Sequence, residues 1–399
     1  MNEDLQSVWA ERRVFIGEVL FCAAYGLALI IRLSYWSANK SIFVFTDAGA
    51  WLNTFKIIAI ILLGLKYFFT QRMRPVMRII GILIIILMWI TFNTSANYTV
   101  LATALFIVCG QNVRVKSLAK IQFAVCILMT LTNIVLVYTG NIKHYIFYRG
   151  DLTRYSLGYT NPNILGMVIF AICLSWCVLT WGKKLYMDFS VIAIGIFICC
   201  FVANSRTYMF ALCLLAVFVF IQHFIKNKRV IKICVAGLTV IVALVVLFSF
   251  FCMLFYPEDN ALFSKINSAL SNRPMLSNLF YEAYGLNIFG KNFSGLSSLW
   301  EGYSFLVDNL FCNILLRFGI IAALLFLVGA AAFYRDALKQ MQWSILLTGM
   351  SLWLITGLAE TYGMMFEINF FLIAISGSVF KEPSEKSEDL PEQDEVTYQ

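Results

Sequence analysis

Charged side chains are scarce in this chain. Asp, Glu, Lys and Arg make up 13% of its 399 residues, whereas soluble globular domains carry roughly 25%. Hydrophobic residues make up 61% of the chain, and phenylalanine alone occurs 36 times. A water-soluble core cannot bury that much apolar surface. The composition therefore excludes an ordinary soluble domain and indicates a protein that is solvated by a lipid bilayer.

Histidine and metal-binding patterns are also scarce. The two histidines are His144 in NIKHY and His223 in a basic stretch, and we interpret both as loop residues without a catalytic partner. We find no Ser-His-Asp arrangement, no glycine-rich phosphate loop and no DxD pattern of the kind that metal-dependent sugar transferases carry. The 11 cysteines lie mostly in apolar runs, where they act as small apolar residues. We therefore expect no metal and no cofactor, and any phosphate binding would depend on arginine.

The net charge of +8 does not indicate a nucleic-acid partner. Lys and Arg gather in the cytoplasmic loops of membrane proteins, and that tendency accounts for the excess. The N-terminal stretch MNEDLQSVWAERR lacks the pattern of a cleavable signal, so we expect the first apolar run to remain as a helix.

Apolar runs that are long enough to cross a bilayer recur along the chain. A membrane helix needs roughly 20 apolar residues, and the fourth run is the shortest of the set. The twelve predicted spans are 14–33, 50–69, 76–92, 98–110, 119–139, 164–181, 188–203, 207–225, 230–254, 303–333, 342–359 and 364–380.

Basic residues alternate between the loops that join these runs. The stretches KYFFTQRMRPVMR, RVKSLAK, GKK, KNKRVIK and YRDALK fall on one side, and the short loops of the other side are nearly bare of Lys and Arg. The positive-inside rule puts the basic side, with both termini, in the cytoplasm. We predict an all-α polytopic membrane protein of about 12 transmembrane helices, with a transmembrane domain over 1–380 and a disordered cytoplasmic tail over 381–399.

Two predicted outer segments are long, 140–163 and 255–302. Both are rich in aromatic residues, Asn, Ser and Gly. The stretch NALFSKINSALSN in the second segment is amphipathic and predicts a short helix lying on the membrane surface.

Four arginines lie on the outer side: Arg149, Arg154, Arg206 and Arg273. The positive-inside rule disfavours arginine there. Each could pair separately with an acidic neighbour or a lipid phosphate. Arg206 favours a second interpretation, because it sits between two apolar runs near membrane depth, where an unpartnered charge is costly. We favour one outer site at which several guanidinium groups bind a polyanion.

Two acidic residues also lie where predicted spans meet the outer side. Asp308 stands in VDNLF and Glu360 in LAETYG. Either could be a carboxylate at a helix end or a catalytic group, and Asp308 stands near a helix N-terminus, where the helix dipole stabilises an acid. Both alternatives stay open at this stage.

The chain resembles O-antigen or capsular polysaccharide polymerases of the Wzy type, in the superfamily that includes the O-antigen ligases. Four stretches carry the resemblance. They are RYSLGYTNPNILG at 154–166, NSRT at 204–207, Arg273 with NIFGKNFSG at 287–295, and VDNLFCNILLRFGII at 307–321. The ligases carry His before the Asn of the last stretch, whereas this chain carries Asp308, which favours a polymerase over a ligase.

The resemblance implies a GT-C-like fold in the bacterial cytoplasmic (inner) membrane, with an active site that faces outward. It implies substrates that are oligosaccharides linked to undecaprenyl diphosphate, and a metal-independent, inverting glycosyl transfer between two such lipids. It also implies a flippase and a chain-length regulator as candidate protein partners.

Roles follow for the residues already singled out. Asp308 is the first candidate for the general base and Glu360 the second. Arg154, Arg206, Arg273 and Arg149 are the candidate ligands of the diphosphate. The candidate sugar contacts are Tyr155, Tyr159, Asn161, Asn163, Tyr281, Tyr284, Asn287, Trp300 and Asn309.

Three other functions compete with the polymerase. One is a ligase-like glycosyltransferase that uses a different acceptor. Another is a flippase for lipid-linked oligosaccharides or a secondary transporter, for which paired charges near the midplane are typical. The third is a structural scaffold, which would leave Arg206 unexplained.

Overall fold

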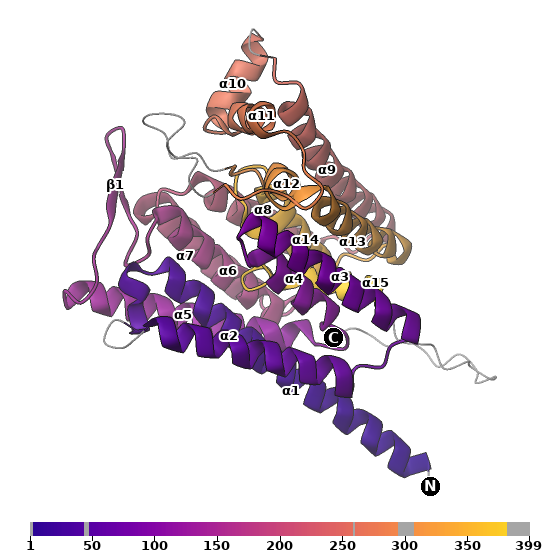
Figure 1. The fold of residues 1–399 in the computed structure, drawn as a ribbon. Helices are drawn as coiled ribbons and strands as arrows, with labels where there is room; N and C mark the ends of the chain where they lie inside the picture. The colour runs from indigo at the N-terminus through magenta and orange to yellow at the C-terminus, as the bar shows by residue number, and fades with distance from the viewer. Residues whose placement is uncertain (1–2, 44–47, 258–259, 294–306, 381–399) are drawn as a thin grey trace.

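The computed structural model describes residues 3–43, 48–257, 260–293 and 307–380. These residues form a bundle of helices with one small β-hairpin (Figure 1). Within the described part, nine helices are long and apolar enough to cross a membrane. The prediction of an all-α, multi-pass membrane protein is confirmed at that level, and the count of twelve spans stays a prediction.

The described elements follow in chain order. They are α1 (Glu3–Trp36), α2 (Ala48–Leu65), α3 (Pro75–Ser95), α4 (Thr99–Val108), α5 (Val115–Tyr138), β1 (Ile146–Arg149), β2 (Leu152–Tyr155), α6 (Pro162–Thr180), α7 (Leu185–Phe197), α8 (Arg206–Phe224), α9 (Lys228–Leu254), α10 (Ala261–Ala269), α11 (Arg273–Tyr284), α12 (Leu310–Asn313), α13 (Gly319–Gln340), α14 (Ile345–Thr356) and α15 (Ile373–Val379).

Helix α6 forms the centre of the bundle. Of its most apolar stretch 78% is buried inside the protein, against 17% for α3. It packs against α5, α7, α8 and α14. A helix that is apolar on every side suits either the core of a bundle or contact with lipid, and NILGMVIFAICLSWCVL has that character. The start of α6 is therefore held firmly in place.

The last two predicted spans, 342–359 and 364–380, are wrong as full-length helices. The structure has α14 with 12 residues and α15 with 7, joined by the segment 357–372, which contains only 3₁₀ turns. Buried backbone of this kind needs partners from the rest of the protein. Thr103 Oγ1 donates to Met364 O, Gln122 Nε2 donates to Ile368 O, and Asn369 Nδ2 donates to Gly363 O.

The predicted outer segment 140–163 folds in part as a β-hairpin, which the sequence interpretation does not include. Strands β1 and β2 are antiparallel, with Phe147 opposite Arg154 and Arg149 opposite Leu152. The turn between them is Gly150–Asp151, and Gly150 has φ 57°. Glycine at the first turn position suits the tight two-residue turns that join such strands.

The tenth predicted span, 303–333, is interrupted. Its described part consists of α12, the π-helical turn Ile314–Phe318, and α13. Gly319 has φ 89°, a conformation that favours glycine. The backbone of the predicted outer segment 255–302 contacts the chain at this break, because Ile320 N donates to Asn287 O and Lys291 N donates to Arg317 O, both at 2.9 Å. The break therefore anchors the outer loop to the bundle.

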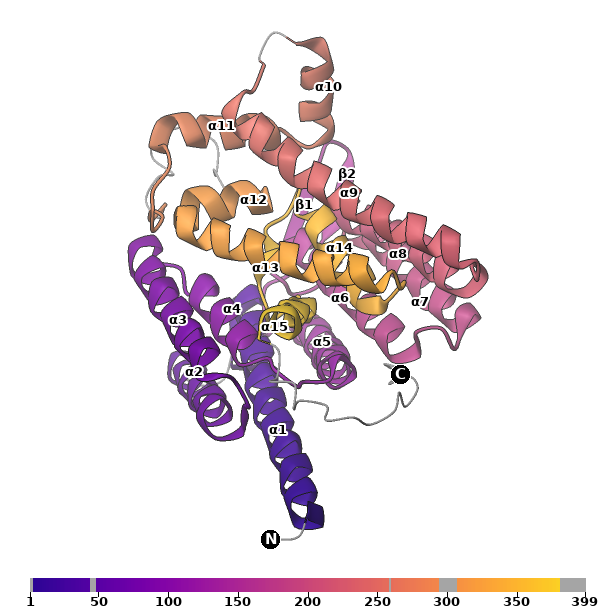
Figure 2. The same cartoon turned by 90° about the vertical axis from the view of Figure 1, so that its right-hand side faces the viewer.

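The predicted amphipathic helix exists as α10, which Asn260 caps through hydrogen bonds from Leu262 N and Phe263 N. With α11 it projects from the end of the bundle opposite the start of α1, as both views show (Figures 1 and 2). Its position on a membrane surface stays a prediction, and the predicted disordered tail 381–399 lies outside the described residues.

Candidate anion-binding and catalytic site

A continuous chain of polar contacts joins four distant segments. Arg154 Nη2 donates to Asn163 Oδ1 at 2.6 Å, and Asn163 Nδ2 donates to Glu360 Oε1 at 3.3 Å. Arg273 Nη2 lies 3.4 Å from the same Glu360 oxygen, and Arg273 Nε lies 3.6 Å from Asp308 Oδ2. We call these five residues the outer cluster. It contains both predicted carboxylates and two of the predicted arginines.

Local structure positions the first half of the outer cluster. Arg154 lies on β2, and its Nε donates to Ala203 O at 3.1 Å. Asn163 is the second residue of α6, where Pro162 occupies the first position and Asn161 is the N-cap. Proline at the first position costs a helix little, because that N–H has no helical partner. The stretch NPN thus begins α6 and points Asn163 at Arg154.

The second half of the outer cluster depends on a contact between α12 and the segment 357–372. Asp308 directly precedes the N-cap of α12, and Glu360 follows α14. Leu310 N donates to Gly357 O at 2.7 Å, which ties the two pieces together. Arg273, the first residue of α11, reaches both carboxylates from the large outer loop.

Arg149 and Arg206 complete the group of arginines without touching the carboxylates. Within the described part of the chain, neither side chain makes a hydrogen bond or an ion pair. They are nevertheless close to the outer cluster. Burial, followed by the charges of Arg206 and Arg273, lowers the pKa of Arg149, and burial, followed by Arg149, lowers the pKa of Arg154 to about 10. Mutual repulsion of this kind favours binding of an anion.

The two carboxyl groups differ in access. Glu360 is 6% exposed, and burial raises its pKa to about 8, with Asp308 adding to the rise and Arg273 opposing it. Partial burial also raises the pKa of Asp308, and the charge of Arg273 opposes that rise. Of the Asp308 side chain, 40% remains exposed. Four guanidinium groups face two carboxyl groups, so the region is net positive in either protonation state of Glu360.

Three predicted sugar contacts have their polar atoms engaged in the fold. Asn161 accepts from Asn163 N at 2.8 Å. Asn309 accepts from Phe311 N and Cys312 N and is buried. Tyr159 is fully buried, and its hydroxyl lies 2.9 Å from Thr130 Oγ1. The geometry gives these three residues structural contacts.

The remaining predicted contacts either make no hydrogen bond with the outer cluster in the described part of the chain or lie outside that part. Tyr155 is on the hairpin, 37% exposed, with its ring 5.8 Å from that of His144. Tyr281, Tyr284 and Asn287 follow Arg273 by 8 to 14 positions, and Tyr281 and Tyr284 lie roughly 12–17 Å further along α11 at 1.5 Å per residue. Trp300 lies outside the described residues.

Two features of this region were missed from the sequence. Tyr362 is partly buried next to the outer cluster, and its pKa is raised by burial and by Glu360 and Asp308. Arg32 and Glu367 form a buried ion pair at 2.7 Å. The signal was available, since Arg32 lies within the first apolar run and Glu367 within the last, and charges inside membrane segments usually pair.

Comparison of the chain with protein-family models, with curated proteins and with solved structures found no match. The chain is therefore placed in no family by those comparisons. Among the described residues, no group of three or more His, Cys, Asp or Glu side chains is arranged to hold a metal ion.

Proposed function

We propose that this protein polymerises lipid-linked oligosaccharide repeat units at the outer face of the bacterial cytoplasmic membrane. The donor is a glycan on undecaprenyl diphosphate, and the acceptor is a repeat unit on the same carrier. The observation that carries the proposal is the outer cluster. In it, Arg273 contacts both carboxyl groups, the hairpin reaches Glu360 through Asn163, and two further arginines, Arg149 and Arg206, lie within electrostatic reach.

The reaction replaces one bond to the anomeric carbon by another. An acceptor hydroxyl oxygen bonds to the anomeric carbon, and the bond from that carbon to the diphosphate oxygen breaks with its electron pair. The hydroxyl proton passes to a carboxylate, and the diphosphate leaves as an anion. Charge therefore grows on the diphosphate, and positioned guanidinium groups stabilise that charge in the transition state.

Asp308 is the better base of the two carboxylates. Its side chain is 40% exposed, so an acceptor hydroxyl can reach it. Glu360 is buried, and with a pKa of about 8 it is mostly protonated near neutral pH. Glu360 is better suited to hold Arg273 and Asn163 in place, because it contacts both.

Arg206 offers the sharpest test, because its side chain makes no hydrogen bond within the described part of the chain, so its donors are available to a ligand. We expect Arg206→Ala to lower the rate of polymerisation of purified lipid-linked repeat units by about 10²–10³-fold. Arg206→Lys should recover only part of the loss, since lysine keeps the charge but not the two-pronged contact with phosphate. The matched control is Lys265→Ala, which removes an exposed cation from α10 in the predicted outer segment 255–302.

Full activity of both Arg206 variants would refute the arginine site. Supplying a lipid A-core acceptor in place of a repeat unit separates the polymerase from a ligase. Transfer to that acceptor alone would replace the proposal by the ligase-like reaction.

A flippase or secondary transporter remains the second candidate because of the segment 357–372. Discontinuous helices and a buried ion pair such as Arg32–Glu367 are typical of transporter sites. Reconstituted vesicles distinguish the two functions. Translocation of a lipid-linked oligosaccharide without chain growth would favour the transporter.

A further inference from the structure

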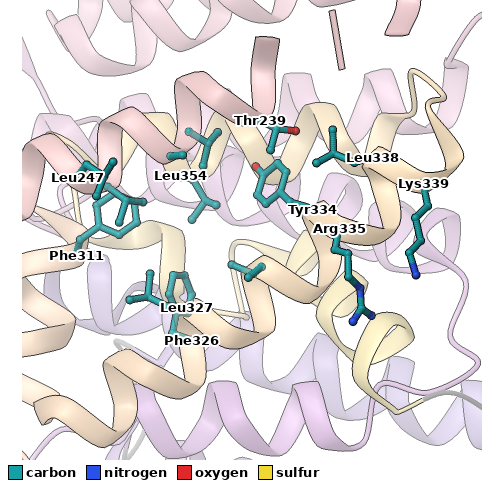
Figure 3. A pocket seen from close by; sticks show the side chains of 15 residues that line it. Thr239, Leu247, Phe311, Phe326, Leu327, Tyr334, Arg335, Leu338, Lys339 and Leu354 are labelled. Atoms are coloured by element: carbon teal, nitrogen blue, oxygen red, sulfur yellow. The ribbon is translucent and has the colours of Figure 1, made fainter. Parts of the chain in front are cut away.

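An apolar groove of about 750 Å³ runs between α9, α13 and α14. Figure 3 shows Leu247 and Phe311 near one end, and Arg335 and Lys339 near the other. The lining is apolar except for those two cations, Thr239 and Tyr334. The hydroxyl groups of Thr239 and Tyr334 are already used, the first on Val235 O and the second on Ser351 Oγ.

The charged end of the groove coincides with the end of α13. Lys339 lies in the last turn of that helix and is exposed, and within the described part of the chain it makes no hydrogen bond or ion pair. The Arg335 side chain is 58% exposed and donates to the neighbouring Asp336 at 3.1 Å. The predicted topology puts this end of α13 at the cytoplasmic surface, where lipid headgroups lie.

We infer that the groove binds one anionic phospholipid of the inner leaflet, with its phosphate at Lys339 and Arg335 and an acyl chain along α13. Basic pockets between membrane helices on the cytoplasmic side suit anionic headgroups. From Phe326 to Lys339 the groove follows α13 for roughly 20 Å, which exceeds half of the hydrocarbon core of about 30 Å. The apolar lining thus matches the acyl chain, and the two cations match the negative headgroup.

This site is separate from the outer cluster, and the inference does not rest on the proposed function. Phe311 closes the far end of the groove only three residues after Asp308. A prenyl chain that enters from the outer side is therefore the competing occupant, and it would make no use of Arg335 or Lys339.

The experiment measures binding of fluorescent phosphatidylglycerol and phosphatidylcholine, with equal acyl chains, to the purified full chain in detergent. We expect the wild type to prefer phosphatidylglycerol. Arg335→Gln with Lys339→Gln should weaken binding of phosphatidylglycerol by about thirtyfold and abolish the preference. Lys183→Gln with Lys184→Gln removes the same charge from another predicted inner loop and should change neither.

A second pair of variants tests the groove without altering its charge. Ala331→Trp fills the groove and should lower binding of phosphatidylglycerol, whereas Val328→Trp, on an exposed face of α13 outside the lining, should not. Equal binding of the two lipids by the wild type would overturn the inference. An Arg335/Lys339 variant that binds phosphatidylglycerol like the Lys183/Lys184 control would also overturn it. So would a polyprenyl phosphate that displaces phosphatidylglycerol equally well from the wild type and from the Arg335/Lys339 variant.

Discussion

Two arginine–glutamate pairs hold the segment 357–372, and they differ in length, in burial and in their further partners. Arg32 and Glu367 lie 2.7 Å apart, with side-chain exposures of 8% and 3%. Arg273 and Glu360 lie 3.4 Å apart, and Arg273 is shared with Asp308 at 3.6 Å. The first pair is short and buried. The second pair is longer, and its arginine also contacts the partly exposed Asp308.

The surroundings of the two pairs explain the difference. Arg32 also donates to Thr99 Oγ1 and lies 4.6 Å and 5.4 Å from the ring centres of Tyr98 and Trp36. Its charge is balanced within the protein. Around Arg273, three further arginines exceed the available carboxylates, so the outer pair has positive charge left for a ligand. The contrast teaches that an arginine stabilises the fold where its charge is balanced within the protein and can bind a ligand where it is not.

The largest expected effect concerns Asp308, which lies beside the Arg273–Glu360 pair. Asp308→Asn should lower polymerisation of lipid-linked repeat units by about 10²–10⁴-fold, the usual contribution of a general base, while thermal unfolding in detergent changes little. Asp151→Asn at the exposed hairpin turn is the control. Wild-type turnover in Asp308→Asn would remove Asp308 as the base.

Substitutions in the buried Arg32–Glu367 pair should change the stability of the fold. Arg32→Met or Glu367→Leu alone leaves an uncompensated buried charge and should lower the free energy of unfolding by about 3–5 kcal/mol, whereas the double variant should lie near the wild type. Chemical unfolding of the purified protein measures all three. If the double variant loses as much as the two single variants added together, the pair does not couple as its geometry indicates.

The pH dependence of stability should depend on Glu360. The pKa of Glu360 is raised from 4.5 to about 8, so the folded state holds a proton that the unfolded state has lost. Stability should therefore fall as pH rises from about 4.5 to about 8, by on the order of a few kcal/mol. Glu360→Gln should make the fall shallower, and Glu282→Gln on the exposed face of α11 should not. The measurement is the melting temperature across this pH range. Identical slopes of melting temperature against pH for the wild type and Glu360→Gln would contradict the expectation.

The smallest expected effect concerns the cap that places Asn163. Asn161→Ala removes the N-cap of α6 and should cost about 1 kcal/mol. Asn227→Ala removes the matching cap of α9, where Asn227 accepts from Arg229 N at 2.9 Å, and should cost a similar amount. Melting temperature and polymerase rate are measured together. Only the Asn161 variant should lose activity beyond its loss of stability, because only that cap adjoins the outer cluster.

Much of the architecture could be predicted from sequence, because the apolar runs are long and the charges between them are few. The argument that outer charges need partners singled out Arg154 and Arg273, and the contacts of Arg273 with Asp308 and Glu360 came from the structure. The segment 357–372 could not be predicted in the same way. Its apolar composition matches that of a buried helix, and its irregular backbone depends on donors such as Thr103 and Gln122 from distant helices.

The small errors have equally physical causes. The hairpin at Gly150–Asp151 is a short exposed element, and its strands of four residues are too short to give a clear alternating pattern. Asn309 and Tyr159 carry polar groups that suit a sugar as well as they suit a helix cap or a buried hydroxyl, so residue type alone does not decide between these uses. Only their contacts do.

By itself the sequence determined the solvent of this protein and the residues that are costly in that solvent, because transfer free energies depend on each side chain and its immediate neighbours. Tertiary structure alone decided how those residues are paired. Arg32 and Glu367, 335 positions apart, neutralise one another, while Arg273 is divided between Asp308 and Glu360. Partner choice depends on which distant segments approach within a few ångströms, and local composition carries no information about that approach.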